Sequence, residues 1–144
     1  MRDGSMPKYL LDTNTCIEYF KRRNGVPERM AAVPIEDLCV SEVTIAELLY
    51  GAVHSRSPER HLREVHELQR DLAVLPIGDV LADYAEIRHA LAVQGLSAED
   101  FDLLVGATAR HYGLVAVTDN LRHFSRMPGV SVENWVSRPP SRPA

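Results

Sequence analysis

The sequence is poor in cysteine and has no long apolar run, and both shortages limit what the protein can be. Cys16 and Cys39 are the only cysteines, and they form no C-x-x-C pair. We therefore interpret them as reduced, packed thiols, and neither indicates a zinc site. No apolar run approaches the roughly 20 residues that span a bilayer, and Met1–Ser5 lacks the apolar stretch of a signal peptide. We expect a cytoplasmic protein without membrane association.

Several catalytic motifs are also missing. The sequence contains neither G-x-G-x-x-G nor a Walker A motif, so nucleotide cofactors are not expected. It has no H-E-x-x-H motif, and His61 and His66 are five positions apart, which does not place them on one helical face. Most of the six histidines are therefore interpreted as surface residues.

The 144 residues, 45% hydrophobic and 25% charged, fit one globular domain. We place this domain at residues 6–136, preceded by a leader or cloning remnant at 1–5 and followed by a disordered, proline-rich tail at 137–144. The net charge of −4 argues against a surface that is basic throughout. From Gly106 onward, however, the sequence contains five arginines and only two acids, which gives this part a net charge of +3.

Short apolar runs alternate with helical segments along the chain. The expected strands are 9–11, 38–40, 74–77, 114–117 and 130–132, and the expected helices are 14–20, 43–53, 57–72, 79–95 and one that begins near 97. Ser41, Asp79 and Ser97 are the expected N-caps. This order predicts an α/β fold whose mainly parallel sheet is covered by helices on both faces. In such sheets ligands bind at the carboxyl ends of the strands, where Asp12 and Asp119 fall.

Two acids stand out by position. Asp12 follows an apolar strand directly and either caps the next helix or points into the crevice. Glu47 is the one mid-helix charge in an otherwise apolar helix, with no Lys or Arg at helical spacing. A carboxylate in such surroundings costs several kcal/mol unless it is paired or binds a cation. The alternative is that the helix turns Glu47 toward water.

Asp102 and Asp119 complete the acidic set. The neighbours of Asp102 on its helix face are small or apolar, which predicts an enclosed carboxylate, with a simple first-turn acid as the alternative. Asp119 is either functional or part of an ordinary Asp-Asn turn. Carboxylates gathered without basic partners repel one another unless a divalent cation neutralises them. An all-oxygen set favours Mg²⁺, with Mn²⁺ as a substitute, over zinc.

In their order and spacing these motifs resemble PIN-domain endoribonuclease toxins of the VapC type. The matching segments are Tyr9–Asn14, Ser41–Gly51, Asp100–Ala107, Thr118–Asn120, His123–Phe124, Arg126, Pro128–Gly129 and Glu133–Trp135. The resemblance implies a PIN-like three-layer sandwich and Mg²⁺-dependent hydrolysis of RNA. It implies Asp12 and Asp102 as metal ligands, with Glu47 directly or through water, and Asn14, Thr118 and Asn120 as a polar turn at the site. It further implies a homodimer, a VapB-like antitoxin and a structured RNA substrate such as tRNA.

One position departs from that pattern. Many relatives carry an acid where this chain has His123, so either Asp119 serves as the fourth catalytic acid or the site has three carboxylates. Arg110, Arg122 and Arg126 are expected to bind the RNA backbone, or else are solvated surface residues. Two rival hypotheses are a catalytically weak PIN fold that only binds RNA or an antitoxin, and a haloacid dehalogenase-like phosphatase. The phosphatase normally needs a second acid at the position of Asn14.

Overall fold

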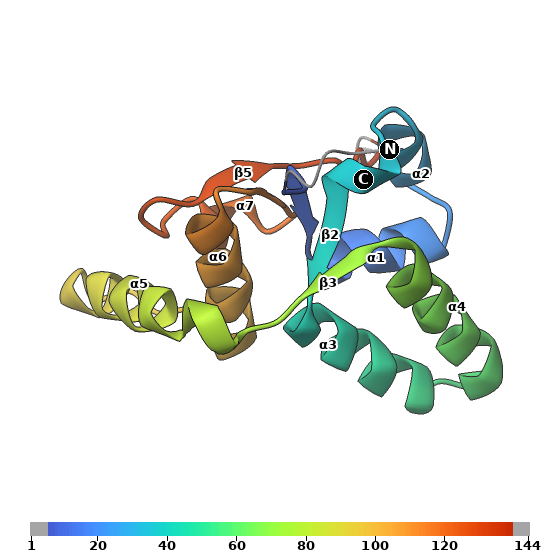
Figure 1. The fold of residues 1–144 in the computed structure, drawn as a ribbon, viewed down its shortest axis with the longest axis horizontal. Helices are drawn as coiled ribbons and strands as arrows, with labels where there is room; N and C mark the ends of the chain where they lie inside the picture. Colours follow the sequence, from blue (N-terminus) through green and yellow to red (C-terminus); the bar gives the residue numbers. More distant parts are fainter. Residues whose placement is uncertain (1–5, 140–144) are drawn as a thin grey trace, which may run out of the picture.

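A parallel sheet lies at the centre of the molecule (Figure 1), in a computed structural model that describes residues 6–139. Its five strands follow the order β3-β2-β1-β4-β5, and every neighbouring pair is parallel. They are β1 (Tyr9–Leu11), β2 (Leu38–Ser41), β3 (Ala73–Leu75), β4 (Val115–Val117) and β5 (Ser131–Glu133). The predicted mainly parallel sheet is confirmed. Because β1 pairs with both β2 and β4, the carboxyl end of β1 lies in the middle of the sheet edge where ligands are expected to bind.

Helices cover both faces of the sheet. They are α1 (Thr13–Phe20), α2 (Val26–Ala31), α3 (Glu42–Val53), α4 (Pro58–Asp71), α5 (Leu81–Val93), α6 (Asp100–Tyr112) and α7 (Leu121–Phe124), with short 3₁₀ turns at Ile35–Asp37 and Gly78–Val80. Alternate strand residues point to opposite faces. Leu11 and Val117 accordingly belong to one buried cluster with α1, α3 and α4, whereas Leu10 and Ala116 belong to another with α5 and α6. Two apolar layers separated by one sheet confirm the three-layer arrangement.

One of the three expected helix caps is present. The Ser41 hydroxyl accepts the Val43 N–H at 3.1 Å and caps α3 as predicted. The prediction for Asp79 was wrong, because Val80 N–H closes a tight turn onto Ile77 and α5 begins only at Leu81. The prediction that Ser97 caps a helix was wrong as well. Its helix begins at Asp100 with Glu99 as the N-cap, so Ser97 lies outside the first turn.

Both thiols are free and buried, as predicted. Burial raises the pKa of Cys39 to about 12 and raises that of Cys16 as well, so both stay protonated and unreactive near neutral pH. Within residues 6–139, no helix has the length and apolarity required to cross a membrane.

The start of the expected tail is held against the domain. Ser137 donates its backbone N–H to the Asn24 carbonyl at 2.7 Å, and the Arg138 guanidinium pairs with Asp119, also at 2.7 Å. These contacts differ from the expectation of disorder from Ser137 onward, because two residues distant in sequence supply partners for this segment. The expected leader at 1–5 and the remainder of the tail at 140–144 lie outside the described residues.

Candidate metal centre

Asp12 occupies the carboxyl end of β1 and begins α1. Its Oδ1 accepts the Thr15 N–H at 2.8 Å, which caps α1, and its own N–H donates to the Val117 carbonyl at 3.0 Å. The side chain is buried, and burial raises the pKa of Asp12, while hydrogen bonds from Thr118 and Thr15 oppose that rise. The helix cap, one of the two alternatives posed from the sequence, is therefore present, and the capping carboxylate lies at the carboxyl end of β1.

Glu47 reaches the same region from α3. Its Oε1 accepts the Thr13 hydroxyl at 2.6 Å, and the residue is half-buried instead of being turned fully into water. One helical turn earlier, Thr44 is fully buried, and its hydroxyl is the one buried side-chain polar atom without a hydrogen-bond partner among the described residues. Residues three apart share a helix face, so a polar atom with unused bonding capacity lies on the Glu47 face of α3.

Asp102, in the first turn of α6, completes a group of three carboxylates. Burial is the largest cause of its raised pKa, followed by the negative charges of Asp12 and Glu47. His123 acts in the opposite direction. Asp12 after β1, Glu47 of α3 and Asp102 of α6 therefore lie close enough for their charges to interact. Within residues 6–139, no Lys or Arg forms an ion pair with any of the three.

A polar turn after β4 borders this group. The Thr118 hydroxyl is fully buried and accepts the Asn120 N–H at 2.9 Å. The Asn120 amide nitrogen lies 3.5 Å from Asp102 Oδ2 and 2.9 Å from His123 Nδ1. The turn therefore brings Thr118, Asn120 and His123 to the carboxylates, whereas Asn14 is exposed on α1. An open cleft of about 410 Å³ adjoins the site and is lined by Glu47, Glu99, Asp100, Phe101 and Asp102.

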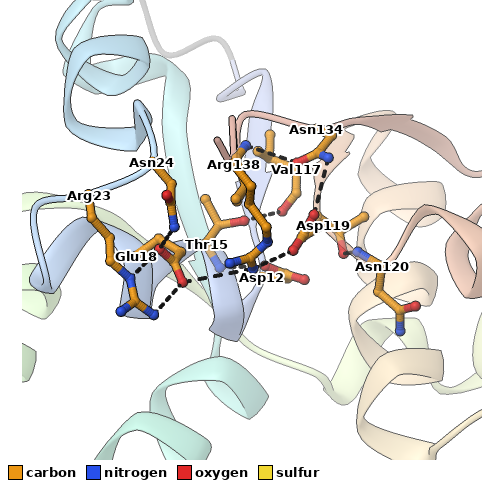
Figure 2. Close-up of polar contacts among 12 residues, drawn as sticks. Asp12, Thr15, Glu18, Arg23, Asn24, Val117, Asp119, Asn120, Asn134 and Arg138 are labelled. Carbon is orange, nitrogen blue, oxygen red and sulfur yellow. Dashed lines mark hydrogen bonds and ion pairs between the residues drawn. The ribbon is translucent and has the colours of Figure 1, made fainter. Parts of the chain in front are cut away.

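Asp119, the expected fourth acid, is engaged elsewhere. Its Oδ1 accepts the Asn134 amide at 3.2 Å and its Oδ2 accepts the Arg138 guanidinium at 2.7 Å. Figure 2 shows Asp119 in these contacts beside Asp12. Its charge still contributes to the raised pKa of Asp12, as the smallest cause. Asp119 thus lies close to the site, but both of its carboxylate oxygens already have partners.

A buried acid that the sequence motifs did not identify is linked to Asp119 through Arg138. Glu18 on α1 is only 3% exposed and accepts hydrogen bonds from Arg23 at 2.7 and 3.0 Å and from Asn24 at 2.6 Å. The Arg23 hydrogen bond is the largest cause of the lowered pKa of Glu18. The signal that identified Glu47, one acid inside an apolar helical segment, is also present at Ile17–Phe20 and would have found it.

The three expected RNA-binding arginines separate into two groups. Arg110 lies eight residues beyond Asp102, about 12 Å along α6, and forms ion pairs with Asp83 at 3.2 Å and with Glu86. The structure therefore does not bring Arg110 to the carboxylates. Arg122 is exposed on α7, the helix that follows the polar turn, and Arg126 is exposed just after α7.

The residues present fit a hard divalent cation. No group of three or more His, Cys, Asp or Glu side chains in residues 6–139 is closed tightly enough to hold a metal ion as it stands. The three carboxylates, which have no basic partner among the described residues, supply the oxygen ligands that such a cation prefers. Asp12, Glu47 and Asp102 are therefore the residues that would hold a metal.

Known proteins share the sequence pattern and the fold of this chain. The sequence profile of the PIN domain matches residues 9–130. The tRNA(fMet)-specific endonuclease VapC of Salmonella typhimurium is 37% identical over 131 residues, which cover 90% of this chain and 99% of the relative. Ribonuclease VapC2 of Haemophilus influenzae is 36% identical over 132 residues, covering 91% and 100%. The DNA-bound VapBC structure from Salmonella typhimurium superimposes with a TM-score of 0.84 over 90% of this chain and 99% of that one.

The fold and the acidic site define a nuclease of a class whose members are generally metal-dependent hydrolases. Within that class, the chain belongs to the PIN-domain family and to its VapC ribonucleases. The resemblance inferred from the motifs is confirmed. The phosphatase alternative is wrong, because the PIN profile covers both the strand that ends just before Asp12 and the helix that carries Asp102.

Proposed function

We propose that this chain is the toxin of a cytoplasmic toxin–antitoxin pair, a Mg²⁺-dependent endoribonuclease that cuts tRNA and thereby stops translation and growth. The observation that carries the proposal is the convergence of Asp12, Glu47 and Asp102 from three elements, without a basic partner in the described residues. The similarity to a tRNA(fMet)-specific endonuclease supports tRNA as the substrate class.

Each residue of the site has a distinct task in this mechanism. A bound Mg²⁺ would supply the positive charge that polarises the scissile phosphate and makes the attacking water more acidic. Asp12 and Asp102 would hold the ion, and Glu47 would hold it directly or through water. Thr13 fixes the orientation of the Glu47 carboxylate, and Asn120 does the same for Asp102. Water attack on the phosphorus expels the ribose 3′ oxygen and leaves a 5′-phosphate and a 3′-hydroxyl.

Cleavage of end-labelled total tRNA by the purified, antitoxin-free protein tests the proposal. We expect discrete cuts with Mg²⁺ or Mn²⁺, none with EDTA, and recovery when metal is restored. The new ends should be 5′-phosphate and 3′-hydroxyl, whereas a 2′,3′-cyclic phosphate would reveal a metal-free mechanism and contradict the proposal. Absence of cleavage of tRNA and other RNA by folded, metal-loaded protein would favour the binding-module hypothesis.

Arg122 and Arg126 are proposed to hold the RNA backbone beside the cleft, and Arg110 is not, because its guanidinium is paired with Asp83 and Glu86. Replacing either exposed arginine with alanine should weaken RNA binding and reduce the salt dependence, the slope of log K against log salt, by about one. The matched control is Arg70→Ala, which removes an exposed arginine of α4 that pairs with its neighbour Asp71. A slope equal to that of the control would remove Arg122 and Arg126 from the interface.

A groove away from the carboxylates is proposed to receive the antitoxin. It has a volume of about 440 Å³ and lies between α1, α2 and α4, with Tyr19, Phe20, Met30 and Leu68 among its apolar lining. Acids of α4 line the same groove, so an apolar antitoxin segment that also carries basic residues fits it. The solved VapBC structures hold relatives of this chain together with their antitoxins.

A homodimer is also proposed, since Tyr50, Val53 and Val93 expose large apolar side chains.

A further inference from the structure

The side chain of Arg138 is held between two acids. Its guanidinium lies 2.7 Å from Asp119 Oδ2 and 4.0 Å from Glu18 Oε1, and Figure 2 shows it between the two carboxylates. Glu18 is buried and bonded to Arg23 and Asn24, so it provides a fixed anchor. The backbone of Ser137 is tied to Asn24 at 2.7 Å, immediately before Arg138. The C-terminal segment thus delivers one positive charge to the edge of the carboxylate site.

We infer that Arg138 is a positioning residue that takes the place of a second divalent cation beside Asp119, so that the site binds a single metal through Asp12, Glu47 and Asp102. This inference rests on the proposed metal-dependent function. Asp119 differs from the other three acids in having a guanidinium partner, and its remaining oxygen is occupied by Asn134.

The charges of the site support one metal. Four carboxylates without a basic partner carry four negative charges, which two divalent cations would balance. With Arg138 on Asp119, the other three carboxylates face one divalent cation, and the excess is a single negative charge. A second cation next to Asp119 would have to displace a charge-assisted hydrogen bond and bind close to the guanidinium. Arg138 therefore both neutralises Asp119 and repels another metal.

Mn²⁺ binding to the full chain tests this role without using catalysis. Free Mn²⁺ is counted by electron paramagnetic resonance and heats are measured by calorimetry, for the wild type, Asp119→Asn, Arg138→Gln, Arg138→Lys and the double variant Arg138→Gln/Asp119→Asn. Wild type and Asp119→Asn should each bind one Mn²⁺ with affinities within about twofold of each other. Arg138→Gln should gain a second, weaker site, and both Arg138→Lys and the double variant should bind only one. Arg29→Gln, which removes an exposed arginine paired with Glu133, is the matched control and should also bind one.

Two results would overturn the inference while leaving the proposed function in place. The first is a loss of about tenfold or more in Mn²⁺ affinity in Asp119→Asn, which would make Asp119 a ligand. The second is a single site in Arg138→Gln, with circular dichroism confirming that the variant is folded. If the wild type binds no Mn²⁺ at all, the metal-dependent function itself fails, and the role of Arg138 fails with it.

Discussion

Asp102→Asn is expected to reduce RNA cleavage by about 1000-fold or more, because it removes one of the principal metal ligands of the proposed site. The same change should raise the melting temperature of the metal-free protein. Burial and the charges of Asp12 and Glu47 raise the pKa of Asp102, so its ionised form destabilises the fold at neutral pH. An amide of the same shape relieves that repulsion. Loss of activity together with a gain in stability is the pattern expected of a functional residue and not of a structural one.

Asp12→Asn provides the parallel test from another element. The amide oxygen can still accept the Thr15 N–H, so the α1 cap and the fold should survive while cleavage is lost. Asp79→Asn, an exposed acid of the 3₁₀ turn before α5, is the control and should retain wild-type activity and melting temperature. Cleavage by either site variant at near wild-type rates would remove that residue from the metal-binding set.

Phe124→Ala should lower the free energy of unfolding by about 3–5 kcal/mol, the usual effect of emptying a fully buried aromatic site. Phe124 is 0% exposed and closes α7, the short helix that holds His123 beside the polar turn. Urea denaturation measures the change. Phe101→Ala is the matched control, because Phe101 is 47% exposed and its loss should change the free energy of unfolding by less than about 1 kcal/mol. Equal losses in the two variants would contradict the assignment of Phe124 to the core.

The sequence predicted the sheet because its strands carry their own signal. Tyr9–Leu11, Leu38–Ser41 and Val115–Val117 are apolar and buried, and each is followed by polar residues that begin a helix or turn. Glu47 and Asp102 could be predicted for a related reason. A carboxylate among apolar neighbours is costly to bury unless it has an ionic partner or binds a cation. The helix starts at Asp79 and Ser97 were misplaced because local turns, which depend on tertiary packing, decide where the first helical hydrogen bond forms.

The partners of Asp119 and Glu18 could not be predicted from local patterns. Arg138 follows the last strand, and Asn24 lies in a loop where Arg22 and Asn24 adopt left-handed backbone angles, with φ of 50° and 58°. Neither residue has a spacing that identifies its contact. Arg110 shows the opposite error. Counting charges along the sequence grouped it with Arg122 and Arg126. Arg110 lies at the opposite end of α6 from Asp102, however, where it pairs with the acids of α5.

The pairing of β1 with β4 also determines when the site can form. It joins Tyr9 to Val115, with β2, β3 and most of the helices between them, and such distant contacts are slow to close. During synthesis, at about 5–20 residues per second, Asp102 and β4 leave the ribosome after every residue that lines the groove between α1, α2 and α4. A growing chain thus contains every residue of the proposed antitoxin groove before it has a complete set of carboxylates. The order of the elements along the chain thus makes the carboxylate site one of the last parts of the domain to be completed.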